Sequence, residues 1–278
     1  LNQKIDVAGA LTFVLFLTSI VLFLSMSEIY GFAFSFYVIP FAVMLFVIFF
    51  LVEKKSKNPL IDVNLFMKNR TFTASNITAL LNYIATYSIV FVFTIYLQVM
   101  LGISPEKAGL ILVAEPVFMV IFSPISGLLA ERYGSRILAS IGMLLIGISF
   151  MMLYVLNLRN TTNILISLSV LGIGFGLFSA PNTNSVMGSA PPGSYGLASG
   201  TLGTMRFTGQ LLSVTIASLF LASSMSRKML LLMFSGIYTQ GYSIFFGSFM
   251  KGLKEMMLFS AVISFIGAYT SLLKNKGE

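Results

Sequence analysis

The chain of 278 residues is 57% hydrophobic and only 9% charged, and its mean hydropathy is +0.94; this composition indicates a polytopic membrane protein. It contains no Cys and no His, which excludes disulfides, thiolate chemistry and the usual proton shuttle and metal ligand. The net charge of +8 comes from basic residues that cluster in short loops between apolar stretches, where they set membrane orientation. We therefore expect neither a nucleic-acid partner nor a metal or other cofactor.

Apolar windows of about 20 residues, the length that crosses the hydrocarbon core of a bilayer, predict eight transmembrane helices. Their predicted ranges are 8–26, 32–52, 74–98, 107–130, 137–157, 164–184, 197–222 and 254–273. The fold class that follows is all-α, a polytopic helix bundle with the lipid bilayer as its partner.

A polar connector separates the first two predicted helices from the other six. It divides the chain into residues 1–52, the connector 53–73 and residues 74–278. Its basic residues are Lys54, Lys55, Lys57, Lys68 and Arg70. The positive-inside rule places this connector in the cytoplasm and, by counting crossings, both ends of the chain there too.

The third predicted span, 74–98, carries more polar side chains than a lipid-facing helix tolerates. Asn82, Tyr83 and Tyr87 fall near its mid-depth. We predict that they line a central cavity, because amide, hydroxyl and aromatic groups suit bulky amphipathic substrates. The alternative is hydrogen-bonded packing between helices.

Glu115 is the sole charge in the apolar run 108–130 and precedes Pro116. An ionisable group at lipid depth is a functional-site hypothesis, and the proline frees the Leu112 carbonyl and bends the helix beside the acid. We expect Glu115 to couple transport to protons, being neutral when shielded from water and ionised when its cavity opens, because burial disfavours the charged form. The alternative is a structural acid paired with Arg206 or a hydroxyl.

The loop between the fourth and fifth spans reads Gly127-Leu128-Leu129-Ala130-Glu131-Arg132-Tyr133-Gly134-Ser135-Arg136. Gly127 lets helices approach closely and Gly134 permits a tight turn. We place Glu131 near the start of the next helix, where an acid is favoured. Arg132 and Arg136 are expected to hold the loop on the cytoplasmic side.

Arg206 is the only basic residue in the stretch 196–224. It shares one helical face with Gln210 and with three small residues, Ser199, Gly203 and Ser213. We predict that Arg206 and Gln210 line the substrate cavity; a brace between helices is an equal alternative for Arg206. Another face carries a small-residue row suited to close helix packing, Gly196, Gly200, Thr204 and Thr208.

The segment Met229–Met250 is uncharged and apolar, but polar and glycine residues near 236–241 interrupt it. We predict an interfacial or re-entrant segment. A ninth span remains the alternative.

The loop 127–136 resembles the cytoplasmic loop signature of the major facilitator superfamily, Gly-x-Leu-Ala-Asp-Arg-x-Gly followed by two basic residues. Glu131 stands where Asp is usual, and Ser135 replaces the first terminal basic residue. In that family the signature is strongest in the first lobe and more degenerate in the second. The resemblance therefore implies a second-lobe segment.

The order of shorter motifs is similar to that of the fourteen-helix drug:proton antiporter branch. These motifs are Asn58-Pro59-Leu60-Ile61-Asp62, Tyr96-Leu97-Gln98, Gly102-Ile103-Ser104-Pro105, the run Gly172 to Gly176 before Pro181, and Gly196-Leu197-Ala198-Ser199-Gly200 before Arg206. The resemblance implies that residues 74–278 form the C-terminal six-helix lobe and residues 1–52 two inserted helices. Since the chain also begins with Leu1, we expect a fragment that lacks an N-terminal six-helix lobe.

The resemblance implies a proton-coupled exporter of small lipophilic or multidrug-type compounds, working by alternating access in the plasma membrane. The alternative is a proton-coupled uptake carrier for a metabolite or organic anion, with Arg206 as the anion contact. We expect no enzyme, because one deep carboxylate without His or Cys cannot assemble a nucleophile with its base or a metal site. The sequence also shows no selectivity-filter loop of a channel.

Overall fold

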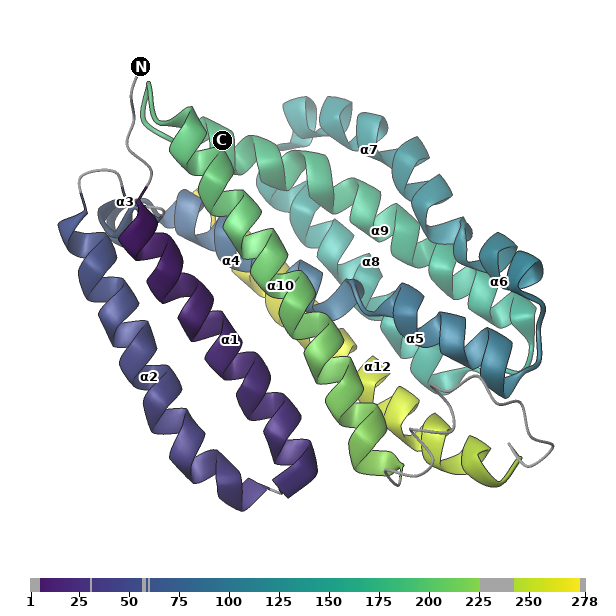
Figure 1. The fold of residues 1–278 in the computed structure, drawn as a ribbon. Helices are drawn as coiled ribbons and strands as arrows, with labels where there is room; N and C mark the ends of the chain where they lie inside the picture. Colours follow the sequence, from purple (N-terminus) through teal and green to yellow (C-terminus); the bar gives the residue numbers. More distant parts are fainter. Residues whose placement is uncertain (1–5, 31, 57–58, 60, 226–242, 276–278) are drawn as a thin grey trace.

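The computed structural model describes residues 6–30, 32–56, 59, 61–225 and 243–275, and every regular element in them is helical (Figure 1). Six of these helical stretches are long and apolar enough to cross a membrane, namely Arg70–Met100, Pro105–Tyr133, Ser135–Val155, Thr161–Gly188, Tyr195–Ser224 and Phe245–Leu272. Val7–Phe23 is a shorter apolar helix. The predicted all-α membrane architecture is confirmed.

The first two helices form a hairpin at the side of the bundle (Figure 1). They are α1 (Val7–Tyr30) and α2 (Phe32–Lys55), and a short helix, α3 (Val63–Lys68), follows them. Aromatic contacts stabilise the hairpin. The ring centroids of Phe13 and Phe49 are 5.2 Å apart, and those of Phe16 and Phe46 are also 5.2 Å apart. The hairpin touches the rest of the bundle chiefly through α10 (Tyr195–Ser224).

The third predicted span begins earlier than expected and is interrupted. It comprises α4 (Arg70–Thr86), α5 (Ile89–Ile95) and a π-helical turn, η1 (Tyr96–Met100). The start is fixed by Asn69, whose side-chain oxygen accepts a hydrogen bond from the Phe72 backbone N–H at 2.9 Å and so caps the helix. Tyr87 and Ser88 separate α4 from α5, a break that the hydrophobic pattern does not reveal.

The fourth span is also divided, at the place where a bend is predicted. Its parts are α6 (Pro105–Leu112) and α7 (Ala114–Tyr133), and Val113 between them lies three residues before Pro116. Proline has no backbone N–H to donate to Leu112, so the helical ladder is broken there.

The prediction for Glu131 is wrong: it lies in the last turn of α7, because that helix runs three residues past the predicted apolar window. The next helix, α8 (Ser135–Val155), starts after Gly134. Gly134 has a φ of 84°, a conformation that side chains with a Cβ rarely adopt, so the predicted tight turn is present.

The remaining helices are α9 (Thr161–Gly188), α10 and α12 (Ser243–Leu272). Pro181 lies inside α9 rather than ending it. Most of the segment Met229–Met250 lies outside the described residues, and the part from Ser243 onward belongs to α12. The last span therefore starts about ten residues before the predicted 254, and the helix accommodates the charges of Lys251 and Glu255 because both side chains are exposed.

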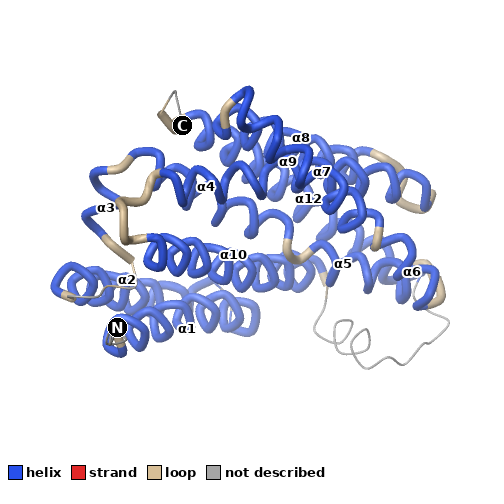
Figure 2. Tube along the Cα trace, turned by 90° about the horizontal axis from the view of Figure 1, so that it is seen from above, coloured by secondary structure: helices blue, strands red, loops and turns tan. Residues whose placement is uncertain are grey.

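The helices pack with α9 against both α7 and α8, and with α12 against α8, α4 and α10 (Figure 2). Glycines permit backbone contact at the crossing of α8 and α9. A Cβ added to Gly142 would lie 2.6 Å from the Gly174 carbonyl oxygen. Only glycine allows the two helices to come this close.

One end of the bundle gathers α3, the start of α4, the junction between α7 and α8 and the end of the described chain (Figures 1 and 2). There the Lys274 amine donates to the Asn182 side-chain oxygen at 2.9 Å, and the Asn275 N–H donates to the Thr71 hydroxyl at 3.1 Å. The opposite end carries Arg159, whose guanidinium lies 4.7 Å from the centre of the Phe246 ring.

Candidate functional site

A cavity of about 530 Å³ opens between α4, α5, α7, α9 and α10. Its lining residues are Tyr83, Thr86, Tyr87, Val90, Phe91, Glu115, Phe175, Gln210 and Val214. Both interrupted spans contribute, since the break at residues 87–88 runs through the lining and Glu115 lies two residues after the break at Val113. The cavity is thus built where two helices depart from regular geometry.

Aromatic side chains shape one wall of the cavity. The rings of Tyr83 on α4 and Phe175 on α9 meet edge to face, with centroids 5.7 Å apart and planes at 81°. Tyr87 is 50% exposed and stands at the break itself, so its ring is open to the cavity. Aromatic faces of this kind bind flat apolar groups and cations.

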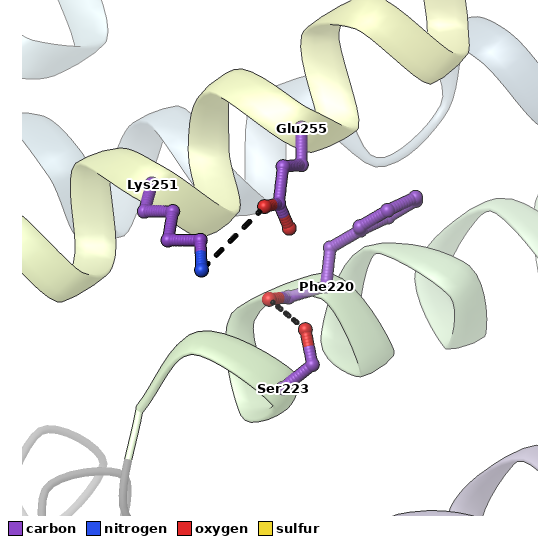
Figure 3. Close-up of polar contacts among 4 residues, drawn as sticks. All are labelled: Phe220, Ser223, Lys251 and Glu255. Atoms are coloured by element: carbon purple, nitrogen blue, oxygen red, sulfur yellow. Dashed lines mark hydrogen bonds and ion pairs between the residues drawn. The ribbon is translucent and has the colours of Figure 1, made fainter.

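Glu115 is the acidic group of the cavity, and it lies half-buried in the first turn of α7. A carboxylate is favoured at a helix N-terminus by the partial positive charge of the free N–H groups. Within the described residues Glu115 forms no ion pair, with Arg206 or any other base; the ion pair that is found joins Lys251 and Glu255 at 4.0 Å, far along the chain on α12 (Figure 3). The pairing of Glu115 with Arg206 is therefore absent in this conformation.

Arg206 lies behind the aromatic wall and is not among the lining residues. Its Nη2 donates to the Thr183 hydroxyl at 2.9 Å, and its guanidinium carbon lies 5.9 Å from the centre of the Tyr83 ring. Arg206 on α10 thereby joins α9 to α4. This geometry is that of the predicted alternative, a brace between helices.

Asn82 is also directed away from the cavity. It is fully buried, and its amide donates to the Met143 sulfur on α8 at 3.3 Å. The structure therefore brings together Tyr83, Tyr87, Glu115 and Gln210, but leaves Asn82 and Arg206 outside the lining.

Five lining residues were not predicted, Thr86, Val90, Phe91, Phe175 and Val214. Thr86 belongs to the polar side of the third span and was the one detectable from its residue type. The other four are apolar, and an apolar residue in an apolar span carries no signal that separates a cavity wall from a lipid-facing surface.

The motif 127–136 comprises the last turns of α7, the turn at Gly134 and the start of α8, and lies at the far end of α7 from Glu115. Glu131 and Arg132 are exposed, and the Arg132 guanidinium lies 5.5 Å from the centre of the Tyr133 ring. The Arg136 carbonyl accepts a hydrogen bond from the Ser271 hydroxyl at 3.4 Å, which joins α8 to α12. A Cβ on Gly127 would meet nothing within 4 Å, so the predicted close helix approach is not made there in the described chain.

The glycines of the predicted packing row on α10 likewise make no close contact with another described helix. A Cβ on Gly196 or Gly200 would meet nothing within 4 Å. Close packing of α10 occurs instead at Gly209, where a Cβ would lie 2.7 Å from the Tyr83 Cβ and 2.8 Å from the Leu80 carbonyl oxygen. The helix therefore packs on α4 through a glycine outside the predicted row.

The chemistry available in the cavity is that of a binding site. Its volume lies within the range of sites that hold drug-sized molecules, roughly 300 to 1,000 Å³. One carboxyl group, one carboxamide and a set of aromatic rings can hold an amphipathic molecule and exchange a proton, and the described chain gathers no group of three metal-ligating side chains.

Comparisons with known proteins identify the family to which the chain belongs. Residues 76–272 match the family model of the Major Facilitator Superfamily. The riboflavin transporter RibZ of Clostridioides difficile (strain 630) is 28% identical over 227 residues, which are 81% of this chain and 47% of that protein. Multidrug resistance protein 3 of Bacillus subtilis (strain 168) is 32% identical over 226 residues, 77% of this chain and 43% of that protein.

A third relative is the multidrug resistance protein Stp of Mycobacterium tuberculosis (strain ATCC 25618 / H37Rv), 29% identical over 184 residues, or 66% of this chain and 34% of that protein. The chain spans about half the length, or less, of these curated relatives. The family model covers most of the chain, including every residue that lines the cavity. The chain accordingly belongs to the Major Facilitator Superfamily and is a multi-pass membrane protein of that transporter family, not an enzyme.

Proposed function

We propose that this chain is the C-terminal part of a drug:proton antiporter of the plasma membrane that exports small lipophilic compounds. In this proposal residues 74–278 form the second lobe, residues 1–52 are inserted helices, and both described ends face the cytoplasm. The observation that carries the proposal is the position of Glu115, a carboxyl group without a basic partner in a cavity lined by aromatic rings.

The proposed mechanism is alternating access, in which this lobe and an N-terminal six-helix lobe rock about a midplane site. Glu115 accepts a proton from the outside and releases it to the cytoplasm as the cavity changes sides. A substrate and a proton compete for the same carboxylate, so outward movement of one is exchanged for inward movement of the other. Tyr83, Tyr87 and Gln210 hold the substrate meanwhile.

Two relatives named multidrug resistance proteins support the choice of substrate class. The cavity supports it as well, because its volume and its aromatic wall suit a flat amphipathic molecule. The basic residues gathered at one end of the bundle support a cytoplasmic location for that end.

The decisive experiment is proton-driven transport of ethidium by the full-length protein in proteoliposomes. We expect E115Q to lose uptake driven by a pH gradient while it still exchanges labelled for unlabelled dye, because a carboxamide binds without carrying a proton. The matched control is E106Q, which changes an exposed acid on α6 and should transport like the wild type. Undiminished gradient-driven transport by E115Q would rule out the coupling role.

A second candidate, a proton-coupled carrier of a metabolite, is favoured by the relative named as a riboflavin transporter. The cavity could hold a flat heteroaromatic ring as readily as a drug. Transport of riboflavin and of ethidium in the same proteoliposomes separates the two, since a dedicated vitamin carrier would exchange the first and not the second.

A further inference from the structure

The break between α4 and α5 is held by a residue from another helix. The Ser88 backbone N–H donates to the Ser213 hydroxyl oxygen at 3.0 Å, and the same hydroxyl donates to the Ser88 side-chain oxygen, also at 3.0 Å. Ser88 is 2% and Ser213 1% exposed, so water cannot replace these bonds easily. The interruption leaves the Ser88 N–H without a partner inside its own helix, and the Ser213 hydroxyl on α10 accepts its hydrogen bond instead.

The backbone at the break is not strained. Tyr87 has φ −63° and ψ −35°, and Ser88 has φ −73° and ψ −8°, both in the right-handed helical region. In a continuous helix the Ser88 N–H would bond to the carbonyl four residues earlier, that of Ile84. The Ser213 hydroxyl and the Ile84 carbonyl are therefore alternative acceptors for one donor, with a small backbone change between them.

The acceptor that the Ser88 N–H uses affects the cavity, because the break lies in the middle of the cavity lining. The lining residues Tyr83, Thr86 and Tyr87 precede it, and Val90 and Phe91 follow it. Straightening the span at Ser88 would turn the second group relative to the first and change the shape of the cavity.

The surroundings of the junction are fixed on both sides. One turn before Ser213, Gly209 brings α10 into backbone contact with α4. Beyond the junction, Tyr96 stacks on Phe249 of α12, with centroids 6.1 Å apart and planes at 10°. The hydrogen bonds at Ser88 thus lie between two tightly packed regions, one on each side of the break.

We propose that Ser213 is a positioning residue for transport: its hydroxyl holds the third span bent at Ser88, and release of that hydroxyl lets the span straighten during the cycle. The inference rests on the proposed function for its role in transport, but the bend itself can be measured without substrate.

The test uses the full-length transporter in nanodiscs, with spin labels at I77C on α4 and T94C on α5. These positions bracket the junction, and this chain has no Cys of its own. We expect S213A to enrich the longer distance about fivefold over the wild type, the change in equilibrium expected for one buried hydrogen bond. S88A retains the N–H donor and should shift the distances less.

The matched control is S223A, which removes an exposed hydroxyl on the same helix whose hydrogen bond among the described residues is to the Phe220 carbonyl of its own turn (Figure 3). S223A should leave the distance distribution unchanged. Distances in S213A equal to the wild type, or a shift in S88A as large as in S213A, would overturn the proposal.

A transport measurement separates this inference from the proposed function. We expect S213A to lower the maximal rate of ethidium exchange about fivefold with little change in dye affinity, because the hydroxyl acts through the helix and not on the substrate. If the wild type moves no ethidium, the proposed function fails while the distance measurement still decides the role of Ser213 in the bend. An unchanged rate in S213A alongside a shifted distance would overturn its role in transport.

Discussion

The side-chain amine of Lys274 and the amide oxygen of Asn182 lie 2.9 Å apart in the interior of the bundle, where Lys274 is only 3% exposed. Asn182 in turn donates to the Ser75 carbonyl at 3.1 Å. Lys274, the second residue after the end of α12, is thereby tied through α9 to α4. Burial lowers the pKa of Lys274 from 10.5 to about 7.

This burial predicts a pH dependence of stability. Between about pH 7 and 10.5 the unfolded chain keeps a proton on Lys274 that the folded chain has lost, so the free energy of unfolding rises with pH across that window. The slope is at most about 1.4 kcal/mol per pH unit. K274M should remove the rise in thermal stability of the full-length protein, and K251M, which changes an exposed lysine, should retain it. Parallel profiles for K274M and the wild type would contradict the prediction.

A second prediction concerns Arg206 as a brace. R206K keeps the charge but cannot hold Thr183 and lie over the Tyr83 ring in the same planar geometry. We expect the affinity for ethidium and for a neutral dye to fall alike, by about three- to tenfold, the effect of one hydrogen bond and one cation–π contact. Binding is measured by fluorescence titration. Selective loss of an anionic ligand would instead identify Arg206 as a direct contact.

A third prediction uses the contact of α9 with α7. A Cβ on Gly172 would overlap the Glu115 carbonyl and lie 2.9 Å from the Phe118 Cβ. G172A should therefore destabilise the protein by about 1–3 kcal/mol, the cost of overpacking. G247A on α12 meets nothing within 4 Å and should be neutral or stabilising by up to about 1 kcal/mol. Thermal unfolding of both variants in one detergent compares them.

A fourth prediction concerns the start of the third span. Asn69 caps α4, and its side-chain amide also donates to the Ser189 carbonyl at 2.7 Å, so N69A loses two contacts. Asn160 caps α9, because its side-chain oxygen accepts a hydrogen bond from the Thr162 N–H at 3.0 Å. N160A should cost about 1 kcal/mol, as loss of a cap does, and N69A roughly twice that. Equal losses of thermal stability would show that the contact to Ser189 contributes nothing.

The helices of this protein could be predicted from the sequence because lipid allows few alternatives to a long apolar helix. Their interruptions were predictable only where the cause is local. Pro116 predicts the break at Val113, because proline lacks a backbone N–H in any surroundings. The break at Ser88 has no such residue, because its cause is a hydroxyl on α10, 125 positions along the chain.

The candidate site was predictable to the same extent. Tyr83, Tyr87, Glu115 and Gln210 reach one cavity because polar and ionisable groups in an apolar span must find protein or water. Whether a polar side chain meets protein or the water of the cavity depends on how its helix is rotated about its own axis. Asn82 lies one residue before Tyr83 and faces α8, about 100° around the helix from its neighbour.

The glycines of α9 have a mechanical consequence for the whole bundle. Gly172 and Gly176 contact the α7 backbone, and Gly174 contacts that of α8 on another side. Because these glycines bring backbone close to backbone, little space is left between the helices, and we expect α9 to move together with α7 and α8. Changes of shape in the lobe are then expected at the break in the third span, where Ser88 is held by Ser213 of α10.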